Sequence, residues 1–579
     1  MIEEMKRVFI ILVMAIVSSL SLYGQGRVVE RTWVSTDKDV YVAGEPVWYS
    51  AFCFDVSTGR LSDVSSVAYL ELHSADGLAA TSKVALYGGR GGGRMMLPNT
   101  LPTGNYRLIV YTAQNRDEVD YDYCGIASKT ISVFNVFSTD RVTGGVEVVT
   151  DEEYENLRSP VKPGMTNGTS QTVMPGFDRA SVGLRCEDGR VTVVNATGKP
   201  MTFSLSVYHD DGFLSNDNPS IAEFIAEARR TGRRSFLGER VPDYEGEVIR
   251  GRVVGFSQEM IPRLIGKYAF ISSPSDKSDV YSAPIREDGS LTFYTAGIYG
   301  DKECVCEIEG IDQSMNCHVE LESPFVNAVV PAPGALRIAP LLGKALQARS
   351  AAMQIERRFE SDTLFDFLPE RDDALFGEDM VRYILDDYTR FPTMEEIFVE
   401  FVQEIRARKG QDGKREIKVR LDESLDGPQF TGGHSLIMLD GVPVFDHEKI
   451  MLYDPLLVET IQIYPHTCFI GNRIFEGVAN FVTYKRNLPS FTFGSNARVI
   501  DWQGISRPMA LTGGSLFAGD GYPDYRQTVY WHPLLSVGAG EEAVAECRLP
   551  DYKGTFVVVA EGITADGEPF FARSSFEVR

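Results

Sequence analysis

The residue types that most often carry catalysis are thinly spread in this sequence. There are seven histidines: His73, His209, His318, His434, His447, His466 and His532. His447-Glu448 lacks the second histidine of an H-E-x-x-H zinc site. Gly433-His434-Ser435 does not form the Gly-x-Ser-x-Gly turn of a serine hydrolase. The sequence therefore shows neither a catalytic triad nor a metal cluster, although a triad assembled from distant residues stays open.

The eight cysteines include one cluster, formed by Cys304, Cys306 and Cys317. If this stretch is a strand, Cys304 and Cys306 face the same side, and Cys317 arrives on the next strand of a hairpin. Two outcomes remain open, namely buried thiols or a disulfide between Cys306 and Cys317 in an oxidising compartment. Three thiols at this spacing are too few for a structural zinc site, so we expect no metal.

Two further motifs are weak signals for ligand binding. The acidic pairs Asp372-Asp373 and Asp386-Asp387 lack the calcium loop's alternating Asp/Asn pattern, so we interpret them as solvated surface. The glycine-rich run from Gly88 to Arg94 lacks the Gly-Lys-Ser/Thr ending of a phosphate-binding loop. We interpret this run as a flexible, exposed hairpin loop, and we expect no cofactor.

Length and composition predict a globular chain of several domains. At 579 residues the chain is too long for one core, and roughly four domains are expected. Its 53 glycines and many tyrosines and phenylalanines favour strands and tight turns. The net charge of −24 argues against non-specific binding to nucleic acid or to an anionic membrane surface.

The first 24 residues have the pattern of a secretory signal peptide. Lys6-Arg7 precede an apolar run from Val8 to Val17, and small residues follow up to Gln25. The run is about half of the ~20 residues that a membrane span needs, so an uncleaved anchor helix is the less favoured interpretation. No cysteine lies near the cleavage zone, which argues against a lipoprotein anchor. We expect an exported protein that begins near Gln25.

Residues 434–485 are predicted to form a strand, a tight turn, a short helix, a strand, a loop and a strand. The run Leu436–Leu439 stops at the turn dipeptide Asp440-Gly441, while residues 456–463 and 477–484 alternate between apolar and polar. In order and spacing this stretch resembles the plug domain of TonB-dependent outer-membrane receptors. The matching pieces are Leu439-Asp440-Gly441-Val442-Pro443, Asp454-Pro455, Val458-Glu459-Thr460-Ile461, Gly471, Gly477-Val478 and Thr483-Tyr484-Lys485.

This resemblance implies an α+β domain over residues 386–488. A helix from Thr393 to Ile405 should lead it, because Thr393 and Glu396 form a capping box. Its apolar face would comprise Met394, Ile397, Phe398, Phe401, Val402 and Ile405. A receptor barrel of 22 strands needs more than ~200 residues, and only residues 486–579 follow, so we expect a plug without its barrel.

Residues 27–137 resemble a macroglobulin-type β-sandwich. The resemblance rests on Thr36-Asp37-Lys38, Tyr41 and Gly44-Glu45-Pro46-Val47, with further strands at roughly ten-residue spacing. Thioester macroglobulins carry a Cys-Gly-Glu-Gln run, which this sequence does not contain. Covalent protease trapping is therefore not implied.

The remaining segments complete the predicted domain order. Asp288-Gly289-Ser290-Leu291-Thr292-Phe293 resembles a turn of carboxypeptidase-regulatory-like sandwiches, which implies a β-sandwich over residues 245–325. The other predicted segments are a linker at 138–179, a small β-rich region at 180–240 with a helix at 221–231, a connector at 326–385 with a helix at 345–359, and a C-terminal β-sandwich-like unit at 489–579.

The fold class is therefore mainly β and multidomain, with immunoglobulin-like or macroglobulin-type β-sandwiches and one α+β plug-like domain. We expect a non-enzymatic envelope protein in the periplasm or on the periplasmic face of a Gram-negative-type outer membrane. It would act through contacts with an outer-membrane or periplasmic protein, and it would not bind nucleic acid. The alternative is a hydrolase or peptidase-associated enzyme whose site the sequence hides.

The predicted partner-binding residues lie in two turns of the plug-like domain. One is Asp440, Gly441, Val442 and Pro443; the other is the loop from Pro465 to Ile474, which carries Phe469 and Ile470. Exposed apolar residues on a rigid scaffold suit partner contact. The interpretation that Phe469 belongs to the domain core stays open.

Overall fold

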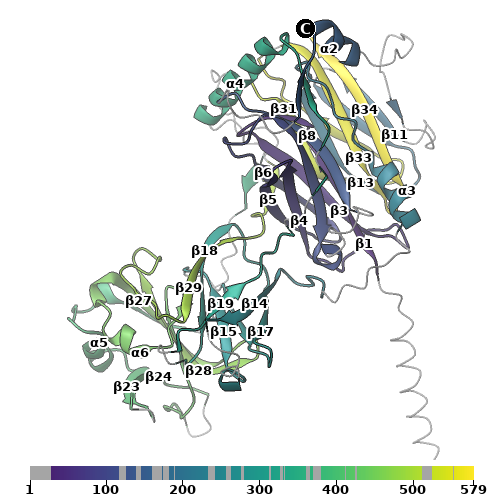
Figure 1. Cartoon of the computed structure of the whole chain (residues 1–579). Helices are drawn as coiled ribbons and strands as arrows, with labels where there is room; N and C mark the ends of the chain where they lie inside the picture. Colours follow the sequence, from purple (N-terminus) through teal and green to yellow (C-terminus); the bar gives the residue numbers. More distant parts are fainter. Residues whose placement is uncertain are drawn as a thin grey trace, which may run out of the picture.

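A computed structural model shows a mainly β chain with several packed units, as predicted (Figure 1). Figure 1 shows one body built from both ends of the chain and a second built from its middle. The structure describes residues 28–116, 126–137, 145–158, 172–173, 182–187, 189–231, 241–255, 262–275, 279–311, 315–326, 330–331, 333–359, 365–368, 380–410, 413–423, 427–511, 524–551 and 553–579. The predicted signal peptide, residues 1–24, lies outside these ranges. Within them, no helix is long and apolar enough to cross a membrane.

Residues 30–134 form the first sandwich. One sheet has the order β1 (Glu30–Thr36), β3 (Pro46–Asp55), β6 (Arg90–Met96). The other has the order β2 (Val40–Val42), β8 (Ala127–Phe134), β7 (Gly104–Thr112), β4 (Val67–Ser74), β5 (Gly77–Ala85). Alternate residues such as Trp33, Leu70 and Leu108 are buried between the sheets, which is the pattern of a sandwich core.

The glycine-rich run is a strand, so its interpretation as a flexible hairpin loop is wrong. Residues 90–96 pair with β3, and the next unit packs closely on them. A Cβ atom on Gly92 would lie 2.6 Å from Pro533 on β31 (Thr528–Val537), and one on Gly93 would lie 2.6 Å from the Tyr49 hydroxyl. The glycines are needed for close packing, not for phosphate binding or for mobility.

The second sandwich joins two segments that the sequence pattern separates. One sheet has the order β10 (Thr172–Val173), β34 (Pro569–Val578), β33 (Gly554–Thr564), β13 (Met201–His209), β31. The other consists of β11 (Val182–Glu187), β12 (Arg190–Asn195) and β32 (Glu542–Glu546). Strands from the predicted region 180–240 and from the predicted unit 489–579 therefore share one core. The predicted helix α3 (Ile221–Thr231) packs against β1 and β34.

The macroglobulin-like motif of the first sandwich ties it to the second. Asp37 is buried, and its carboxylate accepts hydrogen bonds from the Tyr41 hydroxyl (2.8 Å), the Trp48 N–H (3.1 Å) and Thr528 Oγ1 (2.5 Å). Lys38 Nζ donates to the same carboxylate over 2.9 Å. A buried carboxylate needs such donors, which explains why these residue types occur at this spacing.

The predicted linker 138–179 and connector 326–385 contain elements that pack beside the first sandwich. β9 (Val146–Val148) pairs in parallel with β20 (Leu336–Ile338), and α2 (Asp151–Arg158) lies close to them. α4 (Leu342–Phe359) includes the helix predicted at residues 345–359. It carries Arg349, which is 3% exposed. Arg349 donates to Glu45 (3.0 Å) and Asp211 (2.7 Å). Burial opposes the charge of Glu45, but Arg349 and Lys38 hold the pKa of this carboxyl below its ordinary value.

The third sandwich covers residues 248–321 and takes one strand from the predicted C-terminal unit. One sheet has the order β17 (Ser290–Tyr294), β14 (Val248–Val254), β19 (His318–Leu321). The other has the order β16 (Val280–Pro284), β15 (Tyr268–Ser272), β18 (Asp301–Ile308), β29 (Ala497–Gln503). β18 and β19 lie in opposite sheets, so the predicted cysteine hairpin is wrong. Cys304, Cys306 and Cys317 are buried free thiols of this core.

The α+β domain, residues 381–488, matches the predicted plug-like stretch in its element types. Its main sheet has the order β22 (Val381–Ile384), β27 (Val458–Ile470), β28 (Arg473–Thr483), β25 (Leu436–Leu439), β26 (Val442–Pro443). The other elements are the hairpin β23 (Ile405–Lys409) and β24 (Arg415–Val419), the helices α5 (Met394–Glu400) and α6 (His447–Met451), and the short 3₁₀ turns η4 (Leu385–Asp387) and η5 (Pro455–Leu457). β21 (Phe365–Phe367) and β30 (Met509–Leu511) pair separately.

The leading helix is shorter than the predicted span from Thr393 to Ile405. Thr393 caps it as expected, since its hydroxyl accepts the Glu396 N–H (3.3 Å), but the helix ends at Glu400. Val402 and Ile405 are buried as predicted, although from the following turn and from β23. The apolar spacing continues past the helix because the turn and the strand pack on the same core.

The main sheet of the α+β domain is covered on both faces. One face packs on α5 and α6, and the other packs on the third sandwich. Leu436 and Met438 on this second face lie with Phe270 and Val280 of the third sandwich. This double coverage explains why most of β28 is buried without alternation.

Candidate functional site

The turn Asp440–Pro443 is present, but it is not exposed as predicted. Asp440 and Gly441 have φ angles of 49° and 78°, the left-handed pair of a two-residue hairpin turn. The Asp440 side chain is fully buried. Its carboxylate accepts the Thr483 N–H (2.6 Å), the Thr483 hydroxyl (2.7 Å) and the Leu488 N–H (2.9 Å). Val442 and Pro443 are also buried, so this motif stabilises the domain and offers no free surface.

The predicted loop from Pro465 to Ile474 is a β-hairpin rather than a loop. β27 and β28 continue to Ile470 and Arg473, and their side chains alternate in direction. Phe469 is 66% exposed, while Ile470 is 8% exposed and packs on the third sandwich. Ser282 Oγ donates to the Ile470 carbonyl over 2.5 Å. Phe469 therefore remains available for contact, and Ile470 does not.

A cavity of 750 Å³ lies between the α+β domain and the third sandwich. The two histidine motifs that matched no enzyme signature both reach it, together with Glu307 of β18. Burial raises the pKa of Glu307 to about 7, although Asn496 Nδ2 donates to it over 3.2 Å. Burial also lowers the pKa of His447 to about 4, and its Nδ1 accepts the Ile417 N–H (3.0 Å). A neutral imidazole and a carboxyl that titrates near neutrality thus face one cavity.

Ser435, which also lines this cavity, is not set up as a nucleophile. Its hydroxyl donates to the Glu476 carbonyl (2.7 Å) and accepts the Val419 N–H (2.9 Å). Both bonds join β24, β25 and β28, which gives Ser435 a structural role. Among the described residues, no group of three His, Cys, Asp or Glu side chains could hold a metal ion. Asp372-Asp373 lie outside the described ranges.

Exposed and half-buried aromatic, aliphatic and arginine side chains gather on one surface of the α+β domain. We call it the arginine–aromatic surface, and it consists of Ile384, Asp386, Tyr388, Arg390, Phe391, Phe401, Leu456 and Tyr484. Tyr388 stacks on Phe401 with ring centroids 4.2 Å apart and parallel planes. Tyr388 is 41% exposed, Tyr484 is 45% exposed and Leu456 is 61% exposed.

Arg390 orders this surface through five hydrogen bonds. It donates to Asp386 Oδ1 twice (2.5 and 3.1 Å), to the Tyr484 hydroxyl (2.5 Å) and to the carbonyls of Pro455 (3.2 Å) and Val458 (3.0 Å). The Tyr484 hydroxyl in turn donates to Asp386 Oδ2 over 2.6 Å. This donation and the Arg390 contacts lower the pKa of Asp386. Asp386 is predicted as solvated surface, but it also bonds to Arg390 and Tyr484. Tyr484 follows 98 residues later, so the local sequence carries no signal for this contact.

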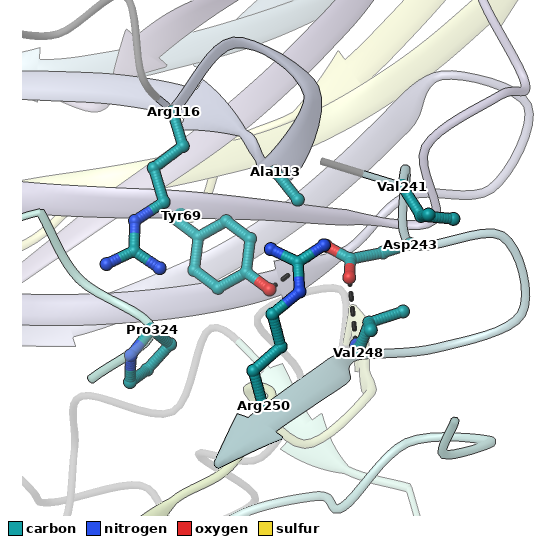
Figure 2. Close-up of a pocket in the computed structure, with 8 residues that line it drawn as sticks. All are labelled: Tyr69, Ala113, Arg116, Val241, Asp243, Val248, Arg250 and Pro324. Carbon is teal, nitrogen blue, oxygen red and sulfur yellow. Dashed lines mark hydrogen bonds between the residues drawn. The ribbon is translucent and has the colours of Figure 1, made fainter. Parts of the chain in front are cut away.

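Figure 2 shows a second buried polar cluster, at the joint between the first and third sandwiches. Asp243 accepts the Val248 N–H (2.8 Å) and the Tyr69 hydroxyl (3.0 Å), and Arg250 lies beside it (Figure 2). Burial raises the pKa of Asp243 to about 7. The cavity here is only 20 Å³, which is room for about one water molecule. We interpret this cluster as part of the joint and not as a ligand site.

The comparisons with known proteins give structural neighbours only. No family model matches the chain, and no curated protein matches it. Salmonella alpha-2-macroglobulin reacted with methylamine aligns at 9% identity and a TM-score of 0.15, over 96% of this chain and 24% of its own. Escherichia coli alpha-2-macroglobulin activated by porcine elastase aligns at 10% identity and a TM-score of 0.23, over 95% and 43%. A tetra-tandem repeat of a large adhesion protein aligns at 8% identity and a TM-score of 0.13, over 95% and 100%.

This chain therefore spans less than half the length of the macroglobulin chains it matches. At these identities and TM-scores the likeness carries no information on activity or partners. The carboxypeptidase-regulatory-like and plug-like resemblances stay predictions from the sequence.

Proposed function

We propose that this chain is an exported, non-enzymatic protein of the cell envelope that holds a protein partner through its α+β domain. The observation that carries the proposal is the arginine–aromatic surface, because tyrosine, phenylalanine and arginine are the residues most enriched at interfaces. Exposing their apolar area to water is unfavourable, and a partner that covers this area would remove that cost.

The surface is also ordered before any partner arrives. Arg390 is fixed by five hydrogen bonds, and Tyr388 is fixed by its stacking on Phe401. Side chains that are already held lose little conformational entropy on binding, so more of the contact energy contributes to affinity. Such preordered groups are typical of interface hot spots.

The proposed location follows from the sequence. The signal-peptide pattern of residues 1–24 and the plug-like order of residues 386–488 support the periplasm or the periplasmic face of the outer membrane. We accordingly propose an outer-membrane or periplasmic protein as the partner.

The test is site-specific photo-crosslinking in envelope extract of the native cells. A photo-reactive amino acid at Leu456, which is 61% exposed, should give one adduct that mass spectrometry identifies as an envelope protein. The same amino acid at Tyr294 of the third sandwich, 62% exposed, is the matched control and should not give that adduct. Tyr388→Ala with Tyr484→Ala should abolish the adduct while the domain stays folded, with only a small drop in melting temperature from the lost stacking and hydrogen bonds. Equal adducts at both positions, or none, would refute the proposal.

The alternative function, a hydrolase, has one observation in its favour. Glu307 titrates near neutrality in a 750 Å³ cavity that it shares with neutral His447, a combination able to exchange protons with a bound molecule. It would require a substrate in this cavity and turnover that Glu307→Gln removes. Turnover of a panel of ester, amide and glycoside substrates, measured with the unchanged chain and with the Glu307→Gln variant, decides between the two functions.

A further inference from the structure

The hairpin β23–β24 leaves one strand edge open along the α+β domain. The N–H of Arg420 donates to the Glu404 carbonyl (2.8 Å), and the N–H of Gly410 donates to the Lys414 carbonyl (2.7 Å). In an antiparallel pair these bonds alternate, so the backbone groups of Arg406 and Arg408 point to β24 and those of Ala407 and Lys409 point away. Among the described residues no further strand pairs with β23.

Two N–H groups on the outer edge of β24, by contrast, are already hydrogen-bonded. The N–H groups of Ile417 and Val419 donate to His447 Nδ1 (3.0 Å) and Ser435 Oγ (2.9 Å). Ile417 and Val419 lie opposite Ala407 and Ile405 in the strand pair. Their N–H groups point away from β23, which agrees with the outward direction assigned to the Ala407 backbone groups. The outward N–H groups at the middle of β24 are therefore already used, whereas no bond to a described residue engages the outward N–H groups of Ala407 and Lys409.

A groove of 550 Å³ follows the open edge of β23. Arg406 and Arg408 line it from one face of the strand, and Ala407 lines it from the other face. Helix α5 supplies an apolar wall through Phe398 and Val399, and Val399 is 77% exposed. Arg420 adds to the basic side, while Glu395 of α5 also lines the groove. The groove thus has a mainly basic side and an apolar side, with strand backbone between them.

The charge of the groove is unusual for this chain, which carries a net charge of −24. Arg406 and Arg408 lie over the Phe430 ring, with the guanidinium carbons 4.6 and 5.3 Å from its centroid. Neither arginine forms an ion pair with a described carboxylate, whereas Arg415 of β24 pairs with Glu395 of α5 over 2.9 Å. The Phe430 ring holds two guanidinium groups in place for an anionic group.

We propose that the open edge of β23 binds an extended acidic segment of a partner protein as an added strand. The partner's backbone would bond to the outward groups of Ala407 and Lys409, which is strand addition at a sheet edge. Every second side chain of the segment would be acidic and would face Arg406 and Arg408. The side chains between them would be apolar and would face Val399. This inference rests on the proposed function and specifies the chemistry of the partner.

The binding test uses the full mature chain and a fluorescein-labelled peptide of eight residues that alternates glutamate and valine. Fluorescence anisotropy should show saturable binding that weakens as salt rises from about 0.05 to 0.5 M. Arg406→Ala with Arg408→Ala should weaken it at least about tenfold, since charge-assisted hydrogen bonds are lost. Arg252→Ala, an exposed arginine of the third sandwich, is the matched control and should change nothing.

A proline at position 407 separates strand addition from simple charge attraction. Ala407→Pro removes an N–H that points away from β24, so the hairpin ladder is retained while the partner loses a donor. Peptide binding should fall about tenfold, and Ala407→Ser, which keeps the N–H, should bind normally. Hydrogen exchange across residues 415–419 checks that the hairpin of the proline variant remains folded.

The outcomes are distinguishable from those of the crosslinking experiment. If the peptide does not bind, or binds the double arginine variant equally well, the inference is wrong even where the adduct at Leu456 persists. Capture of phosphatidylglycerol vesicles in place of the peptide would assign the groove to lipid and overturn it. A chain that dimerises through β23, shown by sedimentation and abolished by Ala407→Pro, would also overturn it.

Discussion

Replacing Asp440 by alanine is expected to destabilise the α+β domain by about 4–6 kcal/mol. The carboxylate is fully buried and accepts three hydrogen bonds, each worth about 1.5 kcal/mol or more to a charged acceptor. Alanine also loses about 1 kcal/mol at a φ of 49°, where aspartate and asparagine are tolerated better. Asp440→Asn keeps this tolerance and one acceptor oxygen, so about half of the loss is expected.

The measurement has to be local, because a chain of several domains does not unfold in one step. Hydrogen exchange of peptides covering residues 436–444 and 478–488 reports the opening free energy of this sheet. The matched control is Asp454→Ala, which removes an exposed carboxylate that accepts a single N–H from Leu456 (2.9 Å) and should cost about 1 kcal/mol. A loss below about 1 kcal/mol for Asp440→Ala, or one equal to the control, would refute the assigned role.

Three further predictions concern burial and charge. Arg349→Met removes the cation that bonds to buried Glu45 and half-buried Asp211, and Glu45 keeps only the more distant Lys38 (3.8 Å). The change should cost about 3–5 kcal/mol, seen as a lower melting temperature of the body that contains the chain ends. The pKa of Glu307 is raised to about 7, so the folded state binds the proton of this carboxyl more tightly than the unfolded state does. The stability that protonated Glu307 contributes to the folded state is therefore lost as pH rises from about 5 to 8. Glu307→Gln should flatten this pH dependence of the melting temperature; an unchanged profile would contradict the assignment. Ile470→Ser should cost about 2–4 kcal/mol and Phe469→Ser under about 1, and similar losses would place Phe469 in the core.

The elements that depend on neighbours in the sequence could be predicted. Asp440-Gly441 forms the expected turn because its φ angles suit these two residue types. Thr393 caps the expected helix, since a capping bond spans only three residues. The end of that helix could not be predicted, because the apolar positions of the turn and strand that follow have nearly the same spacing.

The second sandwich shows what a single sequence leaves open. β13 pairs with β31 and β33, more than 300 residues away, and short alternating strands carry no signal for such a distant partner. The burial of Asp440 has the same origin, because its donors Thr483 and Leu488 follow 43 and 48 residues later. A polar turn residue predicts exposure unless its hydrogen-bond donors are known.

The position of the groove along β23 determines whether a partner can bind without moving the domains. The face of the main sheet that carries Leu436 and Met438 is occupied by the third sandwich, while α5 covers the opposite face through Ile397 and Phe398. The groove along β23 lies beside α5, and no residue of the third sandwich lines it. A partner strand could therefore be added without separating the α+β domain from the third sandwich. Binding would then require no domain opening, and its association rate should not depend on the stability of that joint.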